Sequence, residues 1–137
     1  MTILVVDDDE VDREAIIRAL TESQIANPVV TARDGIEALE CLRGAPGRPA
    51  IEKPLMVLLD LNMPRMNGVE FLQALRSTQG LENTIVFVLS TSEAEEDMLQ
   101  AYRLHVSGYI AKANAARDFA LLAQLLDVYW RLVEFPP

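Results

Sequence analysis

The 137-residue sequence has one cysteine and one histidine, and its basic residues are far fewer than its acidic ones. Cys41 is its single cysteine, so no disulfide can form within the chain, and a reducing, cytoplasmic compartment is expected. Because Cys41 falls within a helical pattern, we interpret it as a small buried side chain rather than a nucleophile. Twelve basic residues against twenty-one acidic ones give a formal net charge of −9, and no basic stripe is available to neutralise nucleic-acid phosphates. We therefore expect no nucleic-acid partner; a cation or a basic protein surface suits the composition better.

Long hydrophobic runs are also missing. The apolar start reaches Asp7 after a few residues and lacks a basic leader, so it does not have the pattern of a signal peptide. No segment approaches the length of a membrane-spanning helix, and no membrane partner is expected. Proline and glycine concentrate in residues 44–54, which we expect to form an irregular surface loop. The length and the dispersed apolar residues predict one domain over residues 1–137, without an internal repeat.

Short apolar runs alternate with segments of helical periodicity along the whole chain. A continuous apolar run between turn residues is typical of a strand buried on both faces of a parallel sheet. We expect strands at residues 2–7, 29–32, 55–60, 85–89 and 108–111, with helices between them and a last helix over residues 115–133. The alternation predicts an α/β fold, a doubly wound (βα)5 three-layer sandwich with a five-stranded parallel sheet and right-handed crossovers.

Three helices carry more detailed signals. Asp34 with Glu37, and Ser92 with Glu95, have the spacing of a capping box, so we expect helices to begin there. The acidic residues that follow Ser92 suit the positive end of a helix dipole, and we assign them a structural role. In the first helix, Val11 begins the set of apolar positions that recur at helical spacing.

The stretch Val-Leu-Leu-Asp-Leu-Asn-Met-Pro, residues 57–64, organises the rest of the sequence. Its apolar run ends in one carboxylate, Asp60, and open α/β sheets bind ligands beyond the carboxyl ends of their strands. Taken alone, Asp60 is explained at least as well as a cap of the turn that contains Asn62 and Pro64.

Polar side chains also stand at or just after the ends of three other expected strands, namely Asp7 and Asp8, Ser90, and Lys112. Carboxylates brought together repel one another unless they are protonated or paired with a cation. Mg²⁺ is the natural companion, because proteins typically bind it through one or two carboxylates and a phosphate oxygen. Lys112 and Ser90 add a positive charge and a hydroxyl that can hold phosphoryl oxygens, with Asp60 as the nucleophile.

Together these motifs resemble the receiver domain of two-component response regulators, and the resemblance covers nearly the whole chain. It implies a flavodoxin-like fold and a signalling phosphoacceptor that catalyses only its own phosphorylation and dephosphorylation, here without an attached output domain. The residues that carry it are Ile3-Leu4-Val5-Val6-Asp7-Asp8, Arg33-Asp34-Gly35-Ile36-Glu37-Ala38-Leu39, Leu59-Asp60-Leu61-Asn62-Met63-Pro64 through Asn67-Gly68, Leu89-Ser90, and Gly108-Tyr109-Ile110-Ala111-Lys112.

The resemblance implies roles for individual residues. Asp60 would accept a phosphoryl group from the phosphohistidine of a sensor histidine kinase. Asp8, Asp60 and the backbone carbonyl of Asn62 would ligate Mg²⁺, with Asp7 acting through water. Lys112 would pair with the phosphoryl group.

The resemblance also implies a switch pair, Ser90 and Tyr109. The hydroxyl would move onto the phosphoryl group and the aromatic ring would turn inward, remodelling the surface around the fourth and fifth helices. The family often has threonine where Ser90 stands, but serine keeps the hydroxyl. The family usually follows its lysine with proline, whereas Ala113 follows Lys112 here. A cis bond without proline costs about 3 to 4 kcal/mol, so we expect a trans bond.

Several features are similar to the small stand-alone regulators paired with bacterial and cyanobacterial phytochrome kinases, which dimerise through the last strand and helix. These features are the loop at 44–54, Lys112-Ala113, Leu104-His105-Val106 and the aromatic C-terminus. For His105, packing or capping is favoured over a phosphohistidine role. The last helix has a core stripe and a second apolar stripe, which we expect to be the dimer face; a broad buried face under the C-terminal tail is the alternative. The second stripe consists of Leu121, Leu125, Val128 and Leu132.

Two other functions compete with a working receiver. A magnesium-dependent phosphohydrolase with an aspartyl nucleophile commonly has a second aspartate two residues later, where this chain has Asn62. A degenerate receiver that acts as a constitutive interaction module is disfavoured by the complete polar set, although the missing proline keeps it open. That set is Asp7, Asp8, Asp60, Ser90 and Lys112.

Overall fold

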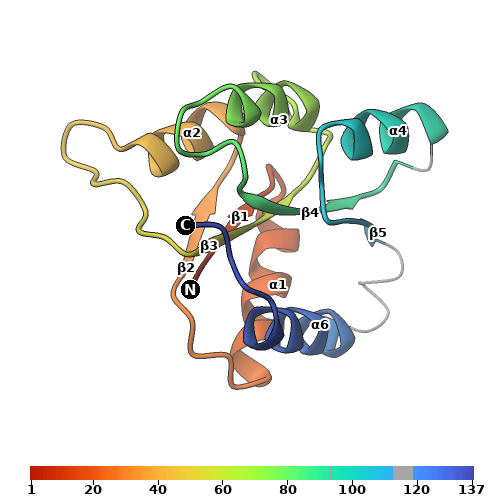
Figure 1. Ribbon diagram of the computed structural model, residues 1–137. Coiled ribbons are helices and arrows are strands. Elements are labelled where there is room, and N and C mark those ends of the chain that lie inside the picture. The colour runs from red at the N-terminus through yellow and green to blue at the C-terminus, as the bar shows by residue number, and fades with distance from the viewer. Residues whose placement is uncertain (93, 113–118) are drawn as a thin grey trace.

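The computed structural model describes residues 1–92, 94–112 and 119–137. Within these residues one parallel sheet has the strand order β2-β1-β3-β4-β5 (Figure 1). The predicted sheet is confirmed, with small shifts at the strand ends that leave Asp7 and Asp60 just beyond β1 and β3. The strands are β1 (Thr2–Val6), β2 (Val29–Ala32), β3 (Leu55–Leu59), β4 (Ile85–Ser90) and β5 (Gly108–Ala111).

Helices cover both faces of the sheet, so the predicted three layers are present. In Figure 1, α2, α3 and α4 lie on one side of the sheet, and α1 and α6 lie on the other. The helices are α1 (Glu10–Glu22), α2 (Gly35–Arg43), α3 (Gly68–Arg76), α4 (Glu95–Arg103) and α6 (Phe119–Leu132). The predicted start of the last helix at residues 115–118 and the Lys112–Ala113 bond lie outside the described residues.

Alternate residues of each central strand enter different core clusters. In β1, Leu4 and Val6 pack into the cluster beneath α2 and α3, whereas Ile3 and Val5 pack into the cluster beneath α1 and α6. Every residue of β3 is buried. This two-sided burial explains why the strands read as continuous apolar runs, and it holds their carboxyl ends at one edge of the sheet. Cys41 is buried in the first cluster, as predicted.

The helix signals were right for α2 and partly wrong for α1 and α4. Asp34 caps α2, since its carboxylate accepts from the N–H of Glu37 at 2.9 Å. The capping box predicted at Ser92 is wrong: α4 begins at Glu95 after Ala94, and the Ser92 hydroxyl donates to Asp97 instead.

Val11 is not part of the buried face of α1, contrary to the sequence pattern. Its side chain is 72% exposed, whereas Ile16, Ala19 and Leu20 are buried. The helical rotation explains the error, because a residue five positions before Ile16 lies roughly 140° around the helix from it. Asp9 caps this helix by accepting from the N–H groups of Val11 and Asp12.

Two further segments lie away from the acidic edge of the sheet. Residues 44–54 form an irregular, largely exposed loop, as predicted, with an isolated bridge between Ala45 and Arg48. His105 is exposed just past α4 with φ +61°, and its N–H donates to the Tyr102 carbonyl, so its backbone closes the helix end. Over the described residues, no helix has both the length and the hydropathy that a bilayer span requires.

Candidate functional site

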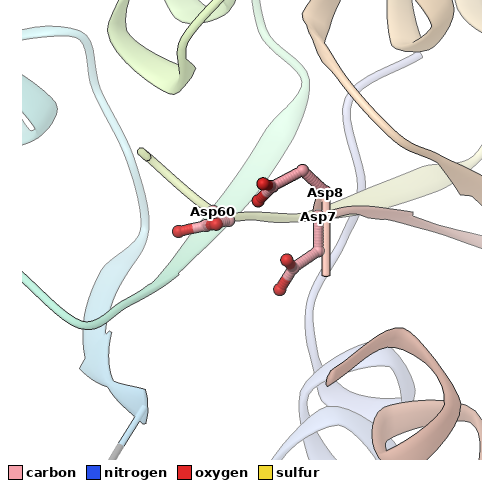
Figure 2. Close-up of side chains that lie close together, drawn as sticks. All are labelled: Asp7, Asp8 and Asp60. Atoms are coloured by element: carbon pink, nitrogen blue, oxygen red, sulfur yellow. The ribbon is translucent and has the colours of Figure 1, made fainter. Parts of the chain in front are cut away.

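Asp7, Asp8 and Asp60 come together beyond the carboxyl ends of β1 and β3 (Figure 2). The two strands pair in parallel, and the Asp60 N–H continues their ladder by donating to the Val6 carbonyl at 2.9 Å. Each aspartate offers a carboxylate oxygen, and these oxygens lie within 4.8 Å of one another. Asp7 and Asp60 are buried, whereas Asp8 is exposed. The sheet therefore gathers a carboxylate cluster with one open side, hereafter the acidic pocket.

Burial and mutual repulsion disfavour the ionised forms of the two buried carboxylates in the acidic pocket. Burial raises the pKa of Asp60 to about 6; Lys112 opposes this rise, and the charge of Asp7 adds to it. Burial also raises the pKa of Asp7, although the Asp9 N–H and Lys112 both donate to its carboxylate. A divalent cation among these oxygens would relieve the mutual repulsion, and hard oxygen donors of this kind suit Mg²⁺ or Mn²⁺. The residues present therefore fit a metal site.

Lys112 supplies the positive charge of the pocket from the end of β5. Its ammonium nitrogen lies 2.9 Å from Asp7 Oδ2, 2.8 Å from Asp12 Oδ2 and 3.5 Å from Asp60 Oδ2. Burial alone would lower the pKa of Lys112, but the hydrogen bonds to Asp12 and Asp7 and the charge of Asp60 raise it above its ordinary value. Lys112 is therefore charged at neutral pH.

The residues predicted as a switch pair converge on the backbone of Ser92. Ser90 is fully buried at the end of β4, and its hydroxyl oxygen accepts from the Ser92 N–H at 3.1 Å. Tyr109, on β5, donates its hydroxyl to the Ser92 carbonyl at 3.0 Å. The switch itself remains a prediction.

Asn62 lies where the sequence places it, two residues beyond Asp60. Its N–H donates to Asp60 Oδ1 at 3.2 Å and thus holds one oxygen of the carboxylate. The role of its carbonyl as a metal ligand remains a prediction.

The start of α3 packs directly against the loop that carries Asp60. A Cβ atom on Gly68 would lie 2.7 Å from the Asp60 carbonyl oxygen and 2.6 Å from Leu61 Cα, closer than real contacts allow. The Gly68 N–H also donates to the Leu61 carbonyl at 2.9 Å. Asn67 and Glu70 form a capping box that fixes this helix start. The sequence showed this glycine only as part of a motif; the close approach is its physical reason.

Sequence reasoning missed two other groups around the pocket. Asp12 binds Lys112, and the guanidinium of Arg13 donates to the Asp7 carbonyl at 2.6 Å. Beyond the acidic pocket, Arg65 lies 2.9 Å from Asp34 and ties the loop after β3 to the cap of α2. Asp12 lies one helical turn after the cap Asp9, so the correct helix start would have placed it on the pocket side; no local signal marks Arg65.

This fold and this pocket agree with the comparison to known families: the chain belongs to the response regulator receiver domain family, whose model matches residues 3–124. It is 31% identical to response regulator Rcp1 of Synechocystis sp. over 128 residues, which are 93% of this chain and 87% of Rcp1. The phosphorylated cyanobacterial phytochrome response regulator RcpA superimposes with a TM-score of 0.88 and 36% identity, covering 99% of this chain and 98% of RcpA. The Mn²⁺-bound form of Rcp1 superimposes with a TM-score of 0.84 and is 30% identical in sequence, with 99% of each chain covered.

Family membership confirms two predictions from the sequence: the resemblance to receiver domains and the fold. The chain is a phosphoacceptor receiver of two-component signalling, a class of signalling proteins whose general partner is a histidine kinase. Receivers bind a divalent metal at an acidic pocket, and the carboxylate cluster at Asp7, Asp8 and Asp60 is such a pocket.

Proposed function

We propose that Asp60 accepts the phosphoryl group, that Mg²⁺ is the metal of the acidic pocket, and that a phytochrome-type sensor histidine kinase is the donor. The observation that carries the proposal is the position of Asp60, buried beyond the central strand, 3.5 Å from Lys112 and within 4.8 Å of Asp7 and Asp8. The similarity to Rcp1 and RcpA supports the phytochrome pairing.

The proposed reaction transfers the phosphoryl group from a histidine nitrogen to a carboxylate oxygen. An oxygen of ionised Asp60 bonds to phosphorus while the bond to the histidine nitrogen breaks, and the nitrogen keeps the electron pair. Asn62 holds Oδ1 through its N–H, and Lys112 faces Oδ2 and receives the phosphoryl oxygens. The protein is thus its own substrate, which distinguishes it from an enzyme with turnover.

Some pocket residues would bind the metal directly and one would bind it through water. Asp8, Asp60 and the Asn62 carbonyl would hold Mg²⁺, with Asp7 acting through water. When bound, the ion supplies positive charge that offsets the charge developing on the phosphoryl oxygens. Asp8 is the exposed carboxylate, so it marks the side from which the ion and the donor enter.

Intact-mass measurement after incubation with acetyl phosphate tests this proposal. We expect a gain of one phosphoryl group with Mg²⁺, and none with chelator or in Asp60→Asn. Asp127→Asn on α6, the same chemical change outside the acidic pocket, should gain the group as the wild type does. Label retained on Asp60→Asn would overturn the assignment of Asp60, and uptake by no form would favour a constitutive interaction module.

We further propose that α6 forms a homodimer face, as the second apolar stripe predicts. The exposed fractions are 61% for Leu121, 43% for Leu125, 52% for Val128 and 78% for Leu132, all at helical spacing on one side. Exposed apolar stripes of this kind favour self-association.

Sedimentation velocity tests the dimer. Replacing Leu125 and Val128 with aspartate should shift the wild-type dimer to a monomer without loss of helical signal. Leu99→Asp on α4, where the leucine is 55% exposed, is the matched control and should leave the dimer intact. A sedimentation coefficient that is unchanged in the double variant would contradict the assignment of this face.

A further inference from the structure

Asp12 is a carboxylate near the acidic pocket to which the proposed reaction assigns no role. It lies in the first turn of α1, outside the group of Asp7, Asp8 and Asp60, and its Oδ2 is 2.8 Å from the Lys112 ammonium nitrogen. This is the shortest of the three carboxylate contacts of Lys112. The pair joins α1 to the end of β5, two elements that are 100 residues apart in the sequence.

The geometry around Lys112 is that of an ammonium group with two donors already fixed. A lysine ammonium has three N–H donors in a tetrahedral arrangement on a flexible stem. Asp12 and Asp7 accept at 2.8 and 2.9 Å, whereas Asp60 lies at 3.5 Å. Once two N–H bonds have fixed partners, one donor remains, and the Asp60 carboxylate is the third carboxylate near the ammonium nitrogen, at 3.5 Å.

We propose that Asp12 is a positioning residue, which orients Lys112 so that its third N–H is directed at the phosphoryl group on Asp60. The proposal rests on the proposed function of Asp60 as phosphoacceptor. Asp7 alone would leave the ammonium free to rotate about a single hydrogen bond. The second hydrogen bond, to the partly exposed Asp12, stops this rotation.

Two effects of Asp12 oppose each other, and the structure decides between them. Its negative charge repels the incoming phosphoryl group and competes for the charge of Lys112, which would slow the reaction. The Asp12 side chain is 37% exposed, however, so water screens its charge. The hydrogen bond that orients Lys112 is of ordinary length and does not depend on long-range charge. Orientation is therefore the larger effect.

Two variants of Asp12 separate these effects. Asp12→Ala removes the acceptor and the charge, whereas Asp12→Asn removes the charge but keeps one carbonyl oxygen that can accept from Lys112. Glu14→Ala is the matched control, because Glu14 is an exposed acid two residues further along α1. The Asp12 carboxylate takes no part in capping α1, which Asp9 performs, so the helix should persist in each variant.

The first measurement is the rate of phosphorylation by acetyl phosphate at saturating Mg²⁺. Asp12→Ala should react roughly threefold to tenfold more slowly than wild type, since a displaced catalytic group costs rate even when it remains present. Asp12→Asn should recover most of the rate, and Glu14→Ala should match wild type. An Asp12→Ala rate equal to or above that of wild type, or an Asp12→Asn rate as low as that of Asp12→Ala, would overturn the proposal.

The second measurement follows Lys112 directly and does not need phosphorylation. The chain has two lysines, Lys53 and Lys112, so ¹⁵N spectra of the ammonium groups can be assigned by a Lys53→Arg variant. The Lys112 protons should exchange slowly with water in wild type and in Asp12→Asn, and fast in Asp12→Ala. Slow exchange in all forms would overturn the orienting role.

The two measurements distinguish the failure of each proposal. If wild type takes up the phosphoryl group and Asp12→Ala does so equally fast, only the inference about Asp12 fails. If wild type takes up none with a competent donor, the proposed function fails and the role of Asp12 falls with it, whatever the exchange data show about Lys112.

Discussion

Replacing Asp60 with asparagine should make the protein more stable at neutral and alkaline pH when no metal is bound. Burial raises the pKa of this carboxyl from 3.8 to about 6. A carboxyl whose pKa is raised by folding stabilises the folded state below its unfolded pKa and loses that contribution as pH rises through the folded pKa. Above that range the buried, ionised Asp60 lowers the free energy of unfolding.

The size of the effect follows from the two pKa values. Each pKa unit corresponds to about 1.4 kcal/mol, so ionised Asp60 costs about 3 kcal/mol relative to its protonated form. Asparagine is neutral and of similar shape, but Lys112 loses one of its partners in the variant. We therefore expect a net gain of roughly 1 to 3 kcal/mol for Asp60→Asn.

Urea unfolding of both proteins in chelator, near pH 8 and near pH 4, measures this gain. Asp60→Asn should be more stable than wild type near pH 8. The difference should shrink near pH 4, where the carboxyl is protonated in the folded state and roughly half protonated in the unfolded state. Mg²⁺ should raise the midpoint of wild type more than that of the variant, because the variant lacks one ligand charge. Asp8→Asn, which changes an exposed carboxylate of the same pocket, should alter stability by less than about 0.5 kcal/mol.

Two outcomes would refute this reasoning. An equal gain at both pH values would show that the gain comes from packing rather than from the charge of Asp60. A loss of stability near pH 8 would show that Lys112 compensates the buried carboxylate fully, and that the acidic pocket has no need of a cation.

Two further substitutions test the surroundings of the pocket. Gly68→Ala should slow phosphorylation by acetyl phosphate and lower the free energy of unfolding by about 1 to 3 kcal/mol, because the new Cβ atom would overlap the Asp60 carbonyl oxygen; wild-type values in both assays would show that the loop yields. Arg76→Met should cost about 2 to 4 kcal/mol, because the guanidinium donates to four backbone carbonyls. Arg103→Met, at an exposed position in the last turn of α4, is its control, and equal losses in the two variants in urea unfolding would refute the role of Arg76.

The fold could be predicted because its main signal is local. Strands buried on both faces are continuous apolar runs, and the residues that end them necessarily meet at one edge of a parallel sheet. That reasoning predicts that Asp7, Asp60 and Lys112 lie close together, and the structure places them within one pocket.

The contacts that could not be predicted from the sequence depend on the rotation of a helix about its axis or on partners distant in the chain. Predicting the contact between Asp12 and Lys112 requires knowing which face of α1 is buried. The apolar pattern gave the wrong face at its start, because it included the exposed Val11. The start of α4 was misplaced because the Ser92 hydroxyl binds Asp97 rather than a backbone N–H of the first turn. The four carbonyls around Arg76 belong to segments on either side of β4, and no spacing in the sequence connects them.

The bonds of Arg76 give α4 two unequal ends. The guanidinium holds the carbonyls of Leu104 and His105, directly after the helix, and binds them to the segment before β4. At the other end Ala94 offers no side-chain acceptor, which costs a helix about 1 kcal/mol relative to a capped start. The Ser90 hydroxyl accepts from the N–H of Ser92, two residues before Ala94 at that weaker end. A rearrangement at Ser90 is therefore expected to tilt α4 about a fixed pivot at its C-terminus, so that the displacement grows along the helix toward its first turn.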